Sequence, residues 1–294
     1  MRQDVTSQAT ERPLLILGAD SPKSSWMRGR LTDAAERRGI RVVTVLGTGL
    51  AAIEHLLAGT DAIAVCAAPR EQALVASVAS GQDIPVSCIP AGGEDLLARD
   101  VGNPLDDPAA ALDHLFSPEE RPFDFGEVNG TMFVNYVALG NDLVLPPAMA
   151  DSGRRWATVV RHPSARRLRY GDPACSSDAA AGTPTRVLVM NNRFALGPDG
   201  LGLRGWADTG LLGIAVRRTP DDARPGAAEH TWDEYSCSDF ELAAAAPVSA
   251  IVDGSNLPLH PPLRFRCVSR ALRVRVGGAR TARGQPPPRR LADR

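Results

Sequence analysis

The sequence predicts an α/β domain followed by an all-β domain. Short apolar runs alternate with helix-like segments over residues 14–116, the pattern of a parallel sheet with helices on both faces. Beyond residue 124 the helical signals give way to short β-branched runs separated by Gly, Asn and Pro. The chain of 294 residues is long enough for two such domains.

The first domain is expected to be Rossmann-like, with strands and helices in alternation. Apolar runs predict buried strands at residues 14–18, 41–46, 62–65 and 84–89. Helical spacing of apolar residues, such as Met27 and Leu31, predicts helices at residues 24–38, 50–57, 71–80, 94–100 and 108–116.

The second domain is expected to be antiparallel. The Asn129-Gly130 pair predicts a hairpin between strands at residues 125–128 and 131–137. Further strands are expected at residues 186–190, 211–216, 239–242, 248–252, 263–268 and 272–276. The predicted domains are residues 12–126 and 127–276, and the polar segments 1–11 and 277–294 are expected to be disordered tails.

Composition narrows the possible functions. A net charge of −1 gives no reason to expect a nucleic-acid partner. No apolar run approaches the ~20 residues of a membrane span, and the polar start lacks a signal peptide's apolar core, so a cytoplasmic protein is expected. The five cysteines and five histidines are scattered without CxxC or HExxH spacing, which argues against disulfides or structural zinc.

Five stretches of the sequence form an ordered set of motifs: IPAGGEDLLARD from Ile89, FDFGEVNGTMFVNYVALG from Phe123, VMNNRF from Val189, WADTGLLGIAV from Trp206 and AIVDGSNLPLHPP from Ala250. In this order they resemble the diacylglycerol kinase catalytic family in its bacterial lipid-kinase branch. The resemblance spans residues 14–276. It implies a nucleotide-binding α/β domain, a β-sandwich-like domain, and ATP with Mg²⁺ in the cleft between them. The implied reaction moves the γ-phosphoryl group to a lipid hydroxyl, such as that of diacylglycerol.

The family's first nucleotide loop, GGDGT, falls by position on residues 66–70, which read Cys-Ala-Ala-Pro-Arg. Glycines in such a loop let backbone N–H groups approach phosphate. Here Ala67 and Ala68 stand where a Gly and the Asp would be, and Pro69 removes a donor and fixes φ. Arg70 could attract phosphate through its guanidinium. A solvated charge in the first helical turn is the simpler interpretation of Arg70.

The second nucleotide loop is partly kept. Gly92 matches the family glycine, Gly93 replaces a Thr, and Asp95 stands where an Asn is usual. The carboxylates of Glu94 and Asp95 would repel a triphosphate if no metal lay between them. They would suit Mg²⁺ as oxygen ligands. The alternative is that they cap a helix N-terminus.

The resemblance also implies three candidate site residues outside the two loops. Asp208, on the first acidic position of a DDG-type motif, is the candidate general base for the lipid hydroxyl; a turn-forming Asp before Gly210 is the alternative. Asn135 and Asp253 are candidate nucleotide contacts, although Ser255 replaces the Glu of the closing DGE motif. Satisfaction of a hairpin backbone and a plain β-turn are their alternatives.

The loop substitutions bear on activity. Both nucleotide loops have changed, so we expect a lipid kinase reaction that is weakened or lost. The alternatives are a non-catalytic protein that binds a lipid or a protein partner, and an enzyme similar to NAD kinases. The arginine-rich segment 154–169 could contact anionic lipids at the inner membrane face, or form a solvated helix face. Oligomeric state is left open.

Overall fold

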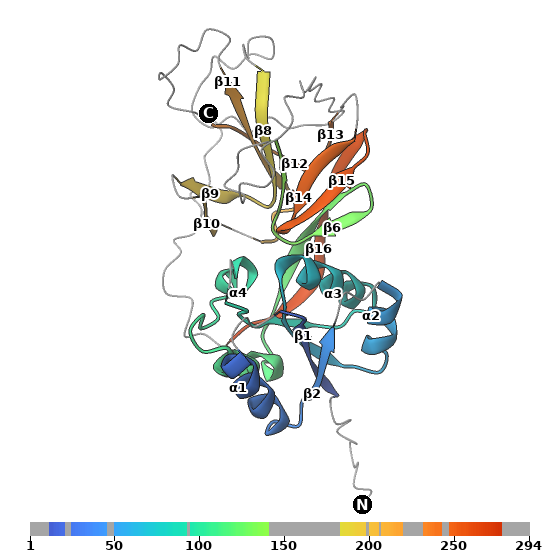
Figure 1. The fold of residues 1–294 in the computed structure, drawn as a ribbon, viewed down its shortest axis with the longest axis vertical. Helices are drawn as coiled ribbons and strands as arrows, with labels where there is room; N and C mark the ends of the chain where they lie inside the picture. Colours follow the sequence, from blue (N-terminus) through green and yellow to red (C-terminus); the bar gives the residue numbers. More distant parts are fainter. Residues whose placement is uncertain are drawn as a thin grey trace, which may run out of the picture.

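The protein is described from a computed structural model, which defines residues 12–20, 25–45, 50–92, 95–140, 183–197, 200–205, 207–219, 232–242 and 247–277. A helix-covered sheet forms one end of the molecule and strands form the other (Figure 1). The predicted fold class, α/β followed by all-β, is therefore confirmed. The arginine-rich segment 154–169 and the expected tail 1–11 lie outside the described residues, as do residues 278–294 of the second tail.

The first domain is built on four parallel strands in the order β2-β1-β3-β4. They are β1 (Pro13–Gly18), β2 (Arg41–Val45), β3 (Ala62–Cys66) and β4 (Val86–Cys88). Helices connect them and cover both faces: α1 (Ser25–Glu36), α2 (Leu50–Leu57), α3 (Pro69–Gly81), α4 (Leu96–Asp100), α5 (Pro108–Ala111) and the 3-10 helix η1 (Leu112–Phe116).

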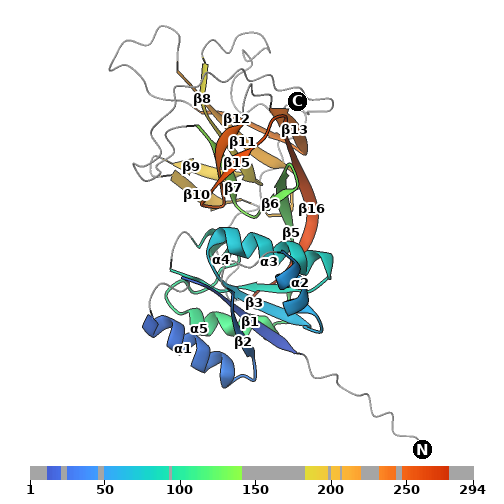
Figure 2. The same cartoon turned by 45° about the vertical axis from the view of Figure 1, so that its right-hand side comes forward.

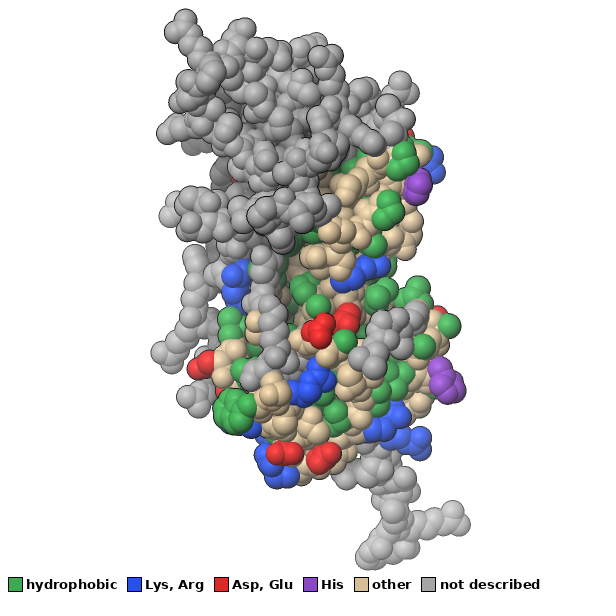
Figure 3. Space-filling view, in the orientation of Figure 1, with side chains coloured by type: hydrophobic (Ala, Val, Ile, Leu, Met, Phe, Trp, Pro, Cys, Tyr) green, Lys and Arg blue, Asp and Glu red, His purple; other side chains and the backbone are tan. Residues whose placement is uncertain are grey.

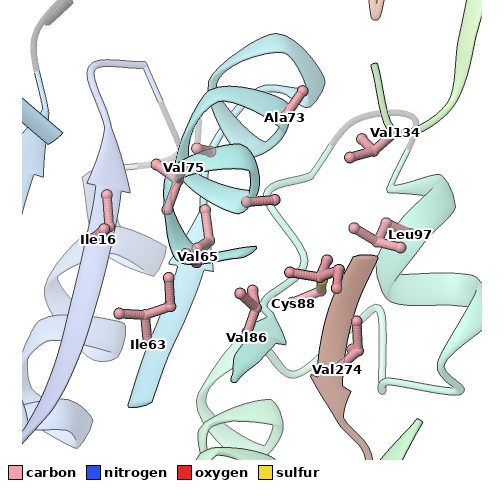
Figure 4. Close-up of a cluster of buried hydrophobic side chains, with 14 of the residues drawn as sticks. Ile16, Ile63, Val65, Ala73, Val75, Val86, Cys88, Leu97, Val134 and Val274 are labelled. Atoms are coloured by element: carbon pink, nitrogen blue, oxygen red, sulfur yellow. The ribbon is translucent and has the colours of Figure 1, made fainter. Parts of the chain in front are cut away.

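Two apolar cores hold this domain together. β1 and β3 are buried along their whole lengths, as expected for central parallel strands packed on both faces. On one face, side chains of α2 and α3 pack against residues such as Ile16 and Val65. On the other, α1 and η1 cover Leu15 and Leu17. Figure 4 shows the first of these cores, which also takes in Val134 from the second domain.

The second domain has a six-stranded antiparallel sheet in the order β12-β11-β8-β7-β14-β15. An apolar core lies between this sheet and residues of the other sheet such as Val128 and Phe265, so the second domain has two layers. In that core the rings of Phe240 and Phe265 stack with centroids 4.8 Å apart. The strands are β6 (Thr131–Phe133), β7 (Tyr136–Leu139), β8 (Thr183–Asn191), β9 (Phe194–Gly197), β10 (Gly200–Arg204), β11 (Leu212–Thr219), β12 (Trp232–Cys237), β13 (Asp239–Leu242), β14 (Val248–Val252) and β15 (Ser255–Leu259).

Two long strands join the domains. β5 (Glu120–Val128) leaves the first domain and β16 (Leu263–Arg275) returns to it, paired antiparallel (Figure 2). Val274 of β16 pairs with Val86 of β4, and Leu272 and Val274 belong to the first domain's core. The expected boundary at residues 126 and 127 thus describes only the first passage of the chain between the domains.

Several elements differ from the sequence-based expectation. The strand expected at 131–137 is interrupted at Val134 and Asn135, because their amides bond to a side chain. The strands expected at 263–268 and 272–276 are one strand with a register shift between Val268 and Leu272. The helix expected from residue 71 begins at Pro69, a residue favoured in the first helical turn. Strands β9, β10, β12 and β15 were not predicted.

The described surface of the first domain mixes charges of both signs, as one face shows (Figure 3). None of the helices in the described residues has the length and apolarity to cross a bilayer.

Candidate functional site

The carboxyl ends of β1, β3 and β4 meet at one edge of the parallel sheet, where α/β proteins place their ligands. The loop after β3, residues 66–70, and the loop after β4, residues 89–95, both lie at this edge. Val134, from the connection between β6 and β7, packs into the first domain's core. The second domain therefore closes on the edge that carries both candidate nucleotide loops.

The first loop is closed by a carboxylate of its own helix. Ala68 occupies the N-cap position of α3 with extended φ and ψ of −61° and 153°. Its backbone N–H donates to Glu71 Oε2 at 3.2 Å. Pro69 has no N–H to offer. The amide that would approach a phosphate is thus bonded to Glu71 instead.

Glu71 also fills the space toward β1. Gly18 ends β1, and a Cβ added there would collide with Glu71 Oε2 and contact Ala67. Arg28 of α1 donates to the carbonyl oxygens of Gly18 and Ala19 at 2.6 and 2.8 Å. Ala67 is 1% exposed. This part of the edge is therefore packed with side chains of the chain itself.

Arg70 points away from the loop, toward the second domain. Its Nη1 donates to the carbonyl oxygen of Met132 at 2.7 Å, and the side chain is partly buried. Burial lowers the pKa of Arg70, and the negative charge of Asp253 opposes that shift. The interpretation of Arg70 as a solvated charge was wrong, because its guanidinium spans the two domains.

The second loop is closed in the same way as the first. The Asp95 carboxylate accepts the backbone N–H of Ala91 at 2.7 Å and that of Gly92 at 2.9 Å. Gly92 adopts φ +83°, where glycine is favoured. Asp95 holds the N-cap position of α4, but these two bonds run back into the loop. Gly93 and Glu94 lie outside the described residues.

Cys66 marks where the two loops meet. Its Sγ donates to the carbonyl oxygen of Pro90 at 3.4 Å. The pKa of the Cys66 thiol is raised to about 12, mainly by burial and also by the charge of Asp95, while the charge of Arg28 opposes the shift. The thiol is neutral at physiological pH and contributes no nucleophile.

Asp253 serves the backbone of the second domain. It lies in the β14–β15 turn with φ +47°. Its carboxylate accepts the N–H groups of Val134, Asn135 and Tyr136 at 2.8, 2.9 and 3.1 Å. Burial raises the pKa of Asp253 to about 6, against the three amides and Arg70, which lower it.

Asn135 is held between buried groups. Its Oδ1 accepts from Arg204 at 3.1 Å, and its backbone carbonyl accepts from the N–H of Asn191 at 2.8 Å. Arg204 is 3% exposed and pairs with Asp100 of α4, with 2.9 Å between Nε and Oδ2. Burial lowers the pKa of Arg204 and raises that of Asp100, while their mutual attraction opposes both shifts.

Asp124 was not predicted. This buried residue of β5 accepts the N–H of Gly210 at 2.7 Å and that of Arg270 at 2.7 Å. It also accepts Nδ2 of Asn192 at 3.2 Å. The signal available in the sequence was an Asp between Phe123 and Phe125, where a buried carboxylate needs partners.

Asp208 lies beside this network. Its carboxylate is 3.6 Å from Nη1 of Arg270, and 31% of its side chain is exposed. Thr209, next to it, bonds to Asn192. Within the described residues, the ion pair of Asp208 is thus with Arg270 and not with a residue of either loop. Arg70, Asn135 and Asp253 lie together at the connection between β6 and β7. Asp208 instead pairs with Arg270, whose backbone N–H donates to Asp124.

The loops do not fit the implied triphosphate in this arrangement. The amides of Ala68, Ala91 and Gly92 bond to carboxylates, and two negative side chains occupy the positions next to them. Across the described residues, no group of three or more His, Cys, Asp or Glu side chains is placed to hold a metal ion.

Comparison with known proteins gives one consistent answer. No family model matches the chain. Two diacylglycerol kinases from strains of Mycobacterium tuberculosis are each 34% identical over 98 residues, which cover 32% of this chain and 32% of each relative. The match thus spans about a third of the length of these relatives. A probable lipid kinase YegS-like protein of Pseudomonas aeruginosa is 24% identical over 300 residues, covering 94% of this chain and 98% of that one.

Solved structures agree in fold. A putative diacylglycerol kinase from Bacillus anthracis superposes with a TM-score of 0.66 at 14% identity, covering 91% of this chain and 98% of that one. Another diacylglycerol kinase structure from this organism gives a TM-score of 0.64 at 13% identity, with 91% and 97% covered.

Fold and site together define a two-domain protein whose second, β domain closes on the ligand-binding edge of an α/β domain. The sequence matches agree with the family that the motifs resemble: a third of the chain is similar to curated diacylglycerol kinases, and nearly all of it to a probable lipid kinase.

Proposed function

We propose that the chain is a diacylglycerol kinase-like protein in which the family reaction, ATP-dependent phosphorylation of a lipid hydroxyl, is weakened or lost. One observation carries this proposal. Carboxylates of the chain, Glu71 and Asp95, accept the loop amides at 2.7–3.2 Å. Backbone amides at such loops are the groups that ordinarily bind phosphate.

The charges near the two loops also support a weakened or lost kinase reaction. Two unit charges about 4 Å apart interact by roughly 4 kcal/mol near a protein surface. A triphosphate bound at the loop amides would meet the negative charges of Glu71 and Asp95, so repulsion would add to the cost of breaking their hydrogen bonds to those amides. The cation at the first loop, Arg70, is turned toward Met132. Recruiting it for phosphate would break that contact.

Two alternatives remain within the proposal. A non-catalytic member that binds a lipid or a protein partner is supported by the interdomain contacts of Arg70 with Met132 and of Arg204 with Asp100, which use charged side chains near the loops for packing. An activity similar to that of NAD kinases has less support, because the curated relatives are named diacylglycerol or lipid kinases. We further propose a cytoplasmic protein, with lipid contact at the membrane surface if a lipid is bound.

Phosphoryl transfer tests the proposal directly. The purified chain, ATP labelled at the γ-phosphate, Mg²⁺ and diacylglycerol in mixed micelles should give far less labelled phosphatidic acid than an active family member, or none. Labelled product formed as fast as by the active member, and abolished in the Asp208→Asn variant, would contradict the proposal. An active family member measured in parallel shows that the assay works.

Restoring the first loop shows whether weak ATP binding comes from the loop residues, from the two carboxylates, or from both. The substitutions Cys66→Gly, Ala67→Gly, Ala68→Asp, Pro69→Gly and Arg70→Thr rebuild the family's first loop. Adding Glu71→Gln and Asp95→Asn removes the two carboxylates. We expect ATP binding to appear only when loop and carboxylates are changed together. The matched control is the restored loop with Glu54→Gln, an exposed carboxylate on α2.

A further inference from the structure

Arg70 and Asp253 come from different domains and bond to the same backbone segment. Arg70 belongs to the first turn of α3, and Asp253 to the β14–β15 turn. The segment between them, residues 132–136, connects β6 to β7, and we call it the crossover corner. In both ribbon views β6 lies next to α3 (Figures 1 and 2).

The two side chains divide the polar groups of the crossover corner. Arg70 donates to the carbonyl of Met132, while Asp253 accepts the amides of Val134, Asn135 and Tyr136. The charges of Arg70 and Asp253 also act on each other. Because both groups are at least partly buried, this attraction is screened less than at an open surface.

A second contact acts on the same corner. Arg204 of β10 donates to the carbonyl of Val134 at 3.0 Å and pairs with Asp100 of α4. The charged groups that act on Asp253 are thus Arg70 from the first domain and Arg204 from the second. Side chains of both domains therefore meet at residues 132–136.

We propose that Arg70 and Asp253 form an interdomain clamp that holds α3 against the crossover corner and fixes the relative orientation of the two domains. Arg70 stands in the segment that corresponds to the family's first nucleotide loop, so this position serves domain packing in the present chain. The clamp is independent of the proposed function, because it is inferred only from contacts between protein groups.

Hydrogen exchange in the full chain tests the clamp. Arg70→Met keeps an apolar stem and removes the charge and the donor. A hydrogen bond from a charged group is worth enough to raise exchange at the amides of Val134, Asn135 and Tyr136 by about 10- to 100-fold. Arg38→Met is the control, because Arg38 pairs with Asp113 inside the first domain. It should leave these three amides unchanged. Equal exchange in Arg70→Met and wild type would overturn the clamp.

A second measurement and a second variant keep the clamp testable if Arg70→Met folds poorly. The side-chain carboxyl ¹³C resonance of Asp253, followed against pH, should shift its midpoint upward in Arg70→Met, because the nearby cation is lost. Arg70→Gln, which also removes the charge, replaces Arg70→Met if that variant unfolds. An unchanged midpoint would show that Arg70 and Asp253 do not interact and would overturn the proposal. Neither readout involves nucleotide, so failure of the clamp is distinct from failure of the proposed function.

Discussion

The carboxylate of Asp95 accepts the backbone N–H of Gly92 at 2.9 Å. Gly92 is the one residue of the two candidate nucleotide loops that keeps the family's glycine, and it has the positive φ that such a turn needs. Its amide is nevertheless bonded within the chain. A retained motif residue can therefore keep its backbone shape while a neighbouring side chain takes its ligand-binding group.

Removing that carboxylate should destabilise the loop. Asp95→Ala deletes the acceptor of two amides, and we expect a loss of about 1–3 kcal/mol in the free energy of unfolding. Urea denaturation measures it. Glu54→Ala, on the exposed side of α2, is the control and should change stability by less than about 0.5 kcal/mol. An Asp95→Ala variant with the same free energy of unfolding as wild type would show that the two hydrogen bonds do not stabilise the protein.

The buried pair of Asp100 and Arg204 should be costly to break. Asp100→Asn leaves a guanidinium that is 3% exposed without its anion, and we expect a loss of about 3–5 kcal/mol. The double variant Asp100→Leu with Arg204→Met should recover part of this loss, because neither position of the pair then leaves a buried charge without its partner. Glu241→Gln, which breaks the exposed pair with Arg264, should cost under about 1 kcal/mol. Chemical denaturation of the four proteins decides between these outcomes.

Asp253 should make stability depend on pH. Its pKa is raised from 3.8 to about 6 in the folded protein. A raised carboxyl pKa means that its contribution to stability is complete below pH 3.8 and is lost as the pH rises through about 6. Relative to Asp253→Asn, the unfolding free energy of wild type should fall by up to about 3 kcal/mol from pH 4 to pH 7. A difference that is flat over this range would contradict the raised pKa.

Asp124 should organise the turn that carries Asp208. Asp124→Asn places an amide where the carboxylate now accepts the N–H groups of Gly210 and Arg270, so one donor loses its partner. We expect a cost of about 1–3 kcal/mol and faster exchange at the amide of Gly210 or of Arg270, whichever faces the new NH₂ group. Asp113→Asn, at an exposed surface pair, is the matched control. Unchanged exchange at both amides would mean that Asp124 does not hold this turn.

The layout of the fold could be predicted because its signals are local. Helical spacing gave α2 with its observed bounds, and the β-branched run 248–252 gave β14. Strand β16 was split in two, since the polar segment around Arg270 reads as a turn and is instead a bulge within one strand. Such irregularities depend on partners far away in sequence, here the carboxylate of Asp124.

The candidate site was predicted less completely for the same reason. The position of residues 66–70 at a strand end follows from local pattern, and so does the loss of glycine there. Sequence could not show that Arg70 reaches Met132, which lies 62 residues away, or that Asp253 bonds to the amides of residues 134–136. A side chain's partner across a domain interface is set by tertiary packing, and single-sequence patterns do not contain it.

Direct ATP binding is the sharpest test of the central claim that internal carboxylates occupy the phosphate-binding amides. Titration calorimetry of the full chain with ATP and Mg²⁺, at nucleotide concentrations up to about 1 mM, should show no saturable heat. The variant with the restored first loop, Glu71→Gln and Asp95→Asn should bind. Saturable binding of ATP to the unaltered chain, with a dissociation constant well below 1 mM, would contradict the account.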